Sequence, residues 1–148
     1  MAAANLHVTL AFLGAVPQGR LPNLIEVARG SSAVLAGAVA SRRALTFDRL
    51  EYWRSAEVLC ALPSEPPEWA AALARMIQEL LTEGGFAPDF TISPFRPHVT
   101  VARKVNRSTR AIDIEPVTWT CSDFVLVDSK TRSDGAVYTV LERFLLEQ

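Results

Sequence analysis

Both histidines of the chain occur in the same three-residue pattern, His-Val-Thr. The first copy is His7-Val8-Thr9 and the second is His98-Val99-Thr100. Imidazole titrates near neutral pH, so one histidine can accept a proton from an attacking water while the other donates a proton to a leaving oxygen. Threonine hydroxyls are neutral donors suited to the non-bridging oxygens of a phosphoryl group. The duplicated pattern therefore predicts acid-base phosphoryl transfer by two histidines, without a metal.

Each triplet is expected to lie on a β-strand, which would place its polar residues together. In a strand, residues i and i+2 share a face and are about 6.7 Å apart. His7 then shares a face with Thr9, and His98 shares a face with Thr100, while the valines turn toward the core. Two such strands side by side would present two imidazoles and two hydroxyls to one cleft.

Three other interpretations of the reactive side chains are open. Each histidine could be a half-buried strand residue with a satisfied hydrogen bond, although a duplicated polar face calls for a common reason. Two histidines without Asp, Glu or Cys at ligand spacing fall short of the three or four ligands of a usual metal site. Neither Cys60 nor Cys121 has a local residue that would activate it as a nucleophile. We therefore expect no metal and no covalent catalysis by cysteine.

The composition describes one folded domain with almost no net charge. The chain has 148 residues, of which 49% are hydrophobic, and 15 Lys+Arg against 16 Asp+Glu give a net charge of −1. Disorder and nucleic-acid binding by bulk electrostatics alone are therefore disfavoured. A local basic segment remains, and it is either a phosphate track or a solvated charged loop. Its cations are Arg96, Arg103, Lys104, Arg107 and Arg110.

The cysteines and the amino terminus bear on the cellular compartment. Cys60 and Cys121 have apolar or β-branched neighbours, as buried free thiols do, which favours a reducing compartment and predicts a cytoplasmic protein. Residues 1–19 are uncharged and partly apolar, but a signal peptide has a basic first region and here the first cation is Arg20. No apolar run approaches the roughly 20 residues of a membrane span, so no membrane association is expected.

The spacing of apolar residues predicts a mixture of strands and helices. Residues 67–82 have the strongest helical pattern, bounded by Pro67 and by Gly84-Gly85. A second helical pattern starts at Arg20, and Gly30-Ser31-Ser32 predicts a break in it. Because helices and strands do not alternate regularly, we predict an α+β fold with mostly antiparallel pairing. The expected strands are residues 6–13, 44–53, 57–62, 98–104, 117–127 and 136–145, the last two joined by a turn at Asp134-Gly135.

The segments around the two triplets resemble a known family. Residues 5–14 (NLHVTLAFLG) and 95–103 (FRPHVTVAR) are similar to the two signature motifs of the 2H phosphoesterase superfamily, and more narrowly of its RNA 2′,3′-cyclic phosphodiesterase (2′-5′ RNA ligase) branch. Residues 124–129 and 138–141 resemble the closing strand pair of that family. The resemblance covers the whole chain. It implies one domain, residues 1–148, with two intertwined pseudo-symmetric lobes of about 1–57 and 58–148.

The resemblance also implies an activity and roles for individual residues. The family hydrolyses a 2′,3′-cyclic phosphate at an RNA end to a 2′-phosphate, and ligation is the same chemistry with a 5′-hydroxyl in place of water. By analogy His7 is the general acid on the 3′ oxygen and His98 is the general base. No cofactor is implied, in agreement with the absence of a nucleotide-binding Gly-Lys loop in the sequence. Alternatives are cyclic phosphodiesterase activity on small nucleotides or ADP-ribose derivatives, and non-catalytic binding of RNA or a nucleotide.

Further substrate contacts follow from the same resemblance. Thr9 and Thr100 would hold the phosphate, and Arg103 would help to hold the phosphate or nearby RNA. Simple strand alternation, however, places Arg103 on the face opposite His98 and Thr100. Candidates for base stacking, which sequence alone does not separate from core aromatics, are Tyr52, Trp53 and Phe95.

One departure from the family concerns the first lobe. Family members usually have an apolar strand and a helix before the first motif, whereas His7 here follows only six residues. We therefore expect a shortened member of the family, whose first lobe lacks one strand and its covering helix and exposes a sheet edge and an apolar patch. Such an edge is a candidate for pairing with a second copy in a homodimer. The alternative is a weakly active protein.

Overall fold

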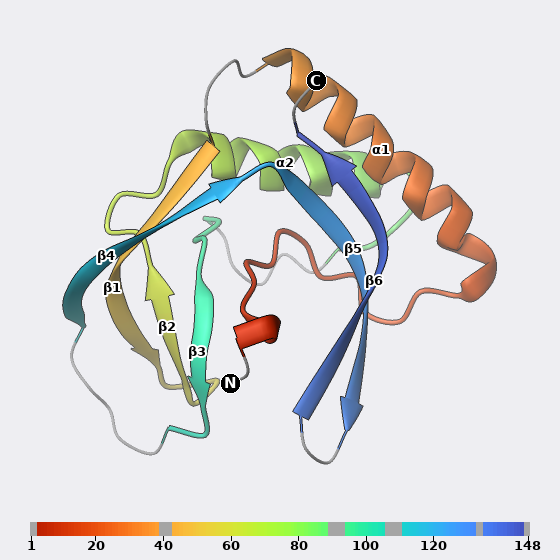
Figure 1. Ribbon diagram of the computed structural model, residues 1–148. Coiled ribbons are helices and arrows are strands. Elements are labelled where there is room, and N and C mark those ends of the chain that lie inside the picture. Colours follow the sequence, from red (N-terminus) through yellow and green to blue (C-terminus); the bar gives the residue numbers. More distant parts are fainter. Residues whose placement is uncertain (1–2, 39–42, 89–93, 106–110, 133–134, 147–148) are drawn as a thin grey trace.

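The computed structural model describes residues 3–38, 43–88, 94–105, 111–132 and 135–146. Figure 1 shows two sheets on either side of the N-terminal segment, with both helices along one end. The elements, in chain order, are the 3-10 helices η1 (Ala3–Asn5) and η2 (Gln18–Arg20), α1 (Leu21–Ala38), β1 (Arg43–Trp53), β2 (Val58–Leu62), α2 (Glu68–Glu83), β3 (Val99–Arg103), β4 (Ile112–Cys121), β5 (Asp123–Arg132) and β6 (Gly135–Leu145).

The larger sheet has the strand order β3-β2-β1-β4 and the smaller sheet consists of β5 and β6. Every strand pair in both sheets is antiparallel. The predicted α+β class with antiparallel pairing is therefore confirmed. β1 and β2 form a β-hairpin within the larger sheet. The larger sheet contains β1 to β4, and the smaller sheet contains the two strands that follow them.

The helix α2 has the features that its sequence predicted. Pro67 precedes its first turn and Gly84 ends it, where the Gly84 N–H donates to the carbonyl of Leu80. Its apolar stripe is buried against two core clusters. The first core cluster consists of Leu24, Leu73, Ile77, Leu81, Phe86 and Leu146. The second core cluster consists of Leu45, Phe47, Ala61, Ala70 and Val99.

Three predicted elements differ in the structure. Residues 6–13 form no continuous strand, but they contain isolated bridge residues at Val8 and Phe12, and Val8 bridges to Val99 of β3. The α1 helix runs through Gly30 without a break, because its face formed by Leu24, Ala28 and Ser31 is buried and this packing outweighs the low helix propensity of glycine. Within the helix the Ser31 hydroxyl donates to the carbonyl of Val27. The segment 117–127 was expected to be one strand, but it is split at Ser122 between β4 and β5, which belong to different sheets.

The smaller sheet is narrow and is covered by a helix. In the described residues it has two strands. Leu24 of α1 packs with Phe124, Leu126 and Leu146. Much of its apolar surface still reaches solvent. The exposed apolar residues of β6 are Val137, Val140, Leu141 and Leu145.

Two further features of the described residues concern the thiols and the helices. Cys60 is fully buried, Cys121 is partly buried, and both are free thiols. Neither described helix is long and apolar enough to cross a membrane.

Candidate active site

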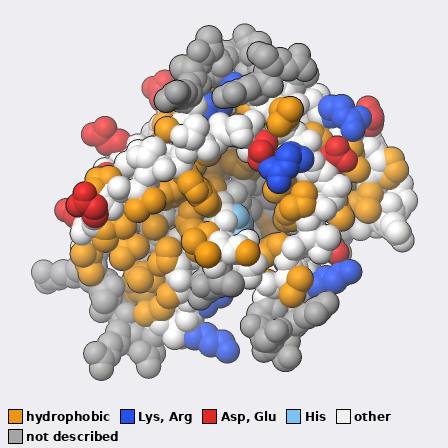
Figure 2. Space-filling model, in the orientation of Figure 1, with side chains coloured by type: hydrophobic (Ala, Val, Ile, Leu, Met, Phe, Trp, Pro, Cys, Tyr) orange, Lys and Arg blue, Asp and Glu red, His pale blue; other side chains and the backbone are white. Residues whose placement is uncertain are grey.

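A single antiparallel bridge between Val8 and Val99 brings the two His-Val-Thr triplets together. In this register, the neighbours on either side also face one another, so His7 lies across from Thr100 and Thr9 lies across from His98. Both valines pack into the second core cluster, which turns the histidines and threonines to the opposite face. Figure 2 shows a hollow near the centre of the molecule, with a histidine side chain in it and hydrophobic side chains around it.

The two imidazoles are held by the backbone in the same way. Nδ1 of His7 lies 2.7 Å from the carbonyl oxygen of Asn5, and Nδ1 of His98 lies 2.9 Å from the carbonyl oxygen of Arg96. A carbonyl oxygen only accepts hydrogen bonds, so Nδ1 carries the proton in each ring. Nε2 of each histidine is thereby left to exchange a proton with another molecule.

Each imidazole also lies against an aromatic ring from a neighbouring strand. His7 contacts Tyr138 of β6 with ring centroids 4.8 Å apart. His98 contacts Trp53 at the end of β1 with centroids 4.4 Å apart. The sequence indicated Trp53 as an aromatic candidate for the site, but it did not indicate Tyr138. The sequence feature that could have identified Tyr138 is its place in the strand pair that resembles the closing strands of the family. Both histidines thus have one backbone contact and one aromatic contact.

The other two aromatic candidates have structural contacts. The Tyr52 hydroxyl donates to the carbonyl of Val105 at 2.9 Å and ties the end of β3 to β1. Phe95 packs against the second core cluster. Of the three candidates, Trp53 is the one whose ring lies against a histidine of the site.

His98 is half-buried, whereas His7 is exposed. Burial lowers the pKa of His98, and the positive charges of Arg96 and His7 lower this pKa further, while the hydrogen bond to the Arg96 carbonyl opposes the change. His98 is therefore neutral at neutral pH, which is the state that a general base requires.

Trp53 lies on the face of β1 that carries the site. The register of β1 with β4 shifts between Phe47 and Arg49, where β4 contains two extra residues, and Phe47 and Leu50 both pack with the second core cluster. Beyond the shift, Glu51 pairs with Cys60 and Trp53 pairs with Val58. These side chains lie on the face opposite the second core cluster, where Val58 and Cys60 form a third core cluster with Leu62.

A second bulge, in β3, places Arg103 on the same face. Cys60 pairs with Thr100 but Leu59 pairs with Ala102, so Val101 is an extra residue that reverses the alternation. Arg103 then pairs with Val58 of the third core cluster. The expectation that Arg103 points away from His98 and Thr100 is therefore corrected. Its positive charge acts on the Cys60 thiol of this face.

The rest of the basic segment divides into distinct environments. The side chain of Arg96 forms an ion pair with Glu51 at 2.8 Å. Lys104 is exposed and turns the chain after β3 with a φ of 56°. Arg107 and Arg110 lie outside the described residues.

The cysteines show no sign of activation as nucleophiles. Burial raises the pKa of both the Cys60 and the Cys121 thiol, which disfavours the reactive thiolate. Sγ of Cys60 lies 3.9 Å from Oγ1 of Thr100, beneath the site. Within the described ranges, no group of three or more His, Cys, Asp or Glu side chains is arranged to hold a metal ion.

The chain is similar to proteins named RNA 2′,3′-cyclic phosphodiesterase over almost its whole length. It is 32% identical to an RNA 2′,3′-cyclic phosphodiesterase of Thermus thermophilus, over 96% of this chain and 72% of that protein. It is 29% identical to an RNA 2′,3′-cyclic phosphodiesterase of Escherichia coli, over 100% of this chain and 80% of that protein. The crystal structure of Escherichia coli LigT complexed with 3′-AMP has 29% sequence identity and a TM-score of 0.75, covering 99% of this chain and 80% of that chain.

The family profile supports the same relationship. The 2′-5′ RNA ligase superfamily matches residues 1–132, a range that includes both His-Val-Thr triplets. Fold, sequence similarity and the placement of the two triplets are thus in agreement. The chain belongs to the 2′-5′ RNA ligase superfamily.

Proposed function

We propose that this protein hydrolyses the 2′,3′-cyclic phosphate at an RNA end to a 2′-phosphate, by two-histidine acid-base catalysis without a metal or cofactor. The observation that carries the proposal is the Val8–Val99 bridge, which sets both triplets on one face. The similarity to RNA 2′,3′-cyclic phosphodiesterases supports the choice of substrate.

The proposed reaction uses Nε2 of each histidine. His98, neutral because its pKa is lowered by burial and by nearby positive charge, accepts a proton from water as the water oxygen attacks phosphorus. The bond from phosphorus to the 3′ oxygen breaks, and protonated His7 donates its Nε2 proton to that oxygen. The products are a 2′-phosphate and a free 3′-hydroxyl. Each histidine ends in the protonation state opposite to the one in which it began.

The phosphoryl oxygens need donors as negative charge builds on them. The Thr9 and Thr100 hydroxyls flank the histidines in the bridge register, which suits them to the two non-bridging oxygens. Arg103 adds a cation on the same face. In the same site, a 5′-hydroxyl of a second RNA could replace water, and the reaction would then form a 2′-5′ linkage reversibly.

The decisive experiment incubates the protein with an oligonucleotide that ends in a 2′,3′-cyclic phosphate, in the presence of EDTA. We expect turnover by the wild type and its loss, by at least about 100-fold, in both His7→Ala and His98→Ala. Unchanged turnover in either variant would contradict the two-histidine mechanism. Loss of wild-type turnover in EDTA would contradict the proposal that the reaction needs no metal.

The same assay separates the alternative functions. A preference for mononucleotide or ADP-ribose cyclic phosphates over oligonucleotides would indicate a small-molecule phosphodiesterase. Salt-sensitive RNA binding without turnover would indicate a binding protein. The pairing of two histidines and two threonines favours catalysis, since binding alone does not need two titrating groups.

The edge of β6 supports a proposal about assembly. The N-terminal segment contacts β6 near its start, where Asn5 donates to the carbonyl of Ala136 and His7 lies against Tyr138. Among the described residues no second strand pairs with β6, and four of its large apolar side chains are exposed. We propose that a second copy pairs its β6 antiparallel with this edge around a two-fold axis. Light scattering should then give twice the monomer mass, and Val140→Lys should return it to the monomer mass. A monomer at all concentrations would contradict the dimer.

A further inference from the structure

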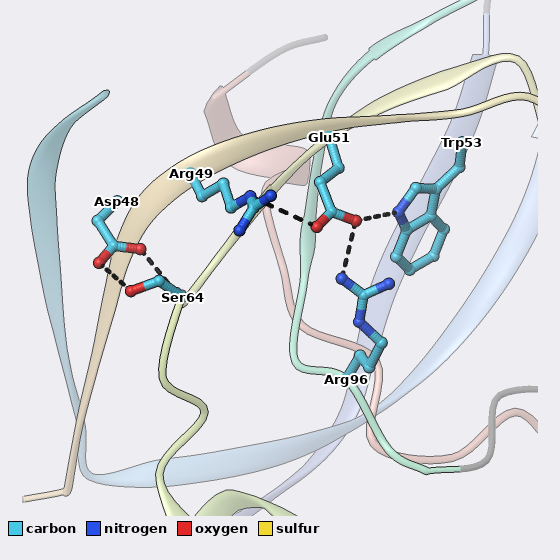
Figure 3. Close-up of polar contacts among 6 residues, drawn as sticks. All are labelled: Asp48, Arg49, Glu51, Trp53, Ser64 and Arg96. Atoms are coloured by element: carbon cyan, nitrogen blue, oxygen red, sulfur yellow. Dashed lines mark hydrogen bonds and ion pairs between the residues drawn. The ribbon is translucent and has the colours of Figure 1, made fainter. Parts of the chain in front are cut away.

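Beside His98 lies a group of side chains centred on the carboxylate of Glu51 (Figure 3). Its Oε2 accepts a hydrogen bond from Nη2 of Arg96 at 2.8 Å and another from Nε1 of Trp53 at 3.4 Å. Its Oε1 lies 3.6 Å from Nε of Arg49. The hydrogen bond and charge of Arg96 outweigh the effect of partial burial and lower the pKa of Glu51, so the carboxylate is ionised at neutral pH.

The two partners of Oε2 are also the two residues that hold His98. The carbonyl of Arg96 accepts the hydrogen bond from Nδ1 of His98, and the ring of Trp53 lies against the imidazole. The Arg96 guanidinium carbon lies 5.7 Å from the centre of the Trp53 ring, so these two side chains are neighbours as well. Both contacts of His98 therefore converge on a single oxygen of Glu51.

We propose that Glu51 is a positioning residue for His98, acting through Arg96 and Trp53. This proposal rests on the proposed function for its effect on turnover, but not for its effect on His98 itself. Glu51 makes no contact with the imidazole. Glu51 anchors the side chain of Arg96, whose backbone carbonyl orients Nδ1 of His98, and it anchors the indole of Trp53, which covers the imidazole. Its negative charge also partly neutralises the positive charge of Arg96.

The surroundings of His98 make the electrostatic effect of Glu51 testable. The positive charge of Arg96 lowers the pKa of His98, and so does the charge of His7. Removing the Glu51 charge should lower the His98 pKa further, and removing the Arg96 charge should raise it. In the described part of the chain, the titratable and charged groups on this face are His7 of the N-terminal segment, Arg96 before β3, Arg49 and Glu51 of β1, Cys60 of β2 and Arg103 of β3.

The test compares Glu51→Gln, Arg96→Gln and the control Asp48→Asn. Asp48 is on the same strand as Glu51, but its carboxylate binds the backbone and hydroxyl of Ser64 (Figure 3). Glu51→Gln and Arg96→Gln should each lower kcat about 10-fold or more with little change in KM. Asp48→Asn removes the same charge as Glu51→Gln and should leave kcat unchanged.

NMR titration of His98 in the free protein gives the readout that does not depend on substrate. The His98 pKa should fall in Glu51→Gln, rise in Arg96→Gln and stay unchanged in Asp48→Asn. If wild-type turnover is absent but these shifts occur, the proposed function fails while the positioning role stands. The positioning role is overturned if Glu51→Gln matches Asp48→Asn in both measurements, or if Glu51→Gln and Arg96→Gln shift the pKa in the same direction. If Glu51→Gln fails to fold, Arg96→Gln still breaks the same ion pair. A rise of the His98 pKa in Arg96→Gln then supports the positioning role, and an unchanged or lower His98 pKa overturns it.

Discussion

Trp53 lies against the imidazole of His98, with the two ring planes inclined by 48°. The indole covers one side of the histidine and contributes to its burial, and burial is the main cause of its lowered pKa. The aromatic neighbour therefore contributes to the lowered pKa of His98.

Trp53→Ala should shift the pH dependence of activity. Without the indole, His98 is better hydrated and its pKa rises toward the usual value of about 6.5. A base must be neutral to accept a proton, so the acid limb of kcat/KM should move to higher pH, and activity at mildly acidic pH should fall. Trp53→Phe keeps a ring on His98 and should keep the wild-type limb. Identical pH profiles for Trp53→Ala and the wild type would show that the indole does not tune the base.

Thr100→Val should lower kcat/KM about 100-fold, because it removes one hydroxyl donor to the phosphoryl group with little change in shape. The register places Thr9 in the equivalent position across from His98, so Thr9→Val should have an effect of the same order. Thr100→Ser retains the hydroxyl and should retain most activity. Steady-state kinetics on the cyclic-phosphate oligonucleotide measure all three, and equal activity of the valine and serine variants would rule out this role.

Arg103→Gln should lower kcat/KM by about 10-fold to 100-fold, as expected for the loss of a charge-assisted hydrogen bond to phosphate. The effect should weaken at high salt, since the cation is exposed. Arg75→Gln on the outer surface of α2 is the control for net charge, because its side chain is 75% exposed and pairs only weakly with Glu79. Equal kinetics for the two variants would mean that Arg103 does not contact the substrate.

Gly84→Ala should destabilise the fold by about 1–3 kcal/mol, because the new methyl group would overpack the contact between the helices. A Cβ at this position would lie 2.8 Å from Cγ2 of Val27 in α1. Gly30→Ala is the matched control, since no atom lies within 4 Å of its added Cβ. In a helix interior that change should stabilise by about 0.5–1 kcal/mol. Urea denaturation compares the two, and a neutral Gly84→Ala would show that α1 and α2 adjust freely.

Elements with strong local patterns could be predicted from the sequence. α2 lies within one residue of the predicted range, because its apolar spacing and its proline and glycine boundaries are all local signals. The strands β1, β2 and β3 were predicted for the same reason. The shared face of the two triplets followed from their repetition, since each places its histidine and threonine two residues apart.

Features that depend on pairing between distant segments could not be predicted. The bulge at Val101 is defined by how β3 pairs with β2, a strand about 40 residues away in the chain. The residue type of Val101 does not by itself indicate a bulge. Strand alternation therefore placed Arg103 on the wrong face. The split of segment 117–127 at Ser122 is likewise decided by which sheet each half joins. Tyr138 escaped notice because its partner His7 is distant in the chain.

The helix α2 and the N-terminal segment each pack against both core clusters. Trp69 of α2 touches both, and the N-terminal segment contributes Val8 to one and Leu10 to the other. If one sheet unfolded alone, the other sheet would lose its packing against α2 and the N-terminal segment. The N-terminal segment with His7 and the start of β3 with His98 are therefore expected to stay together until the whole domain unfolds in one cooperative transition.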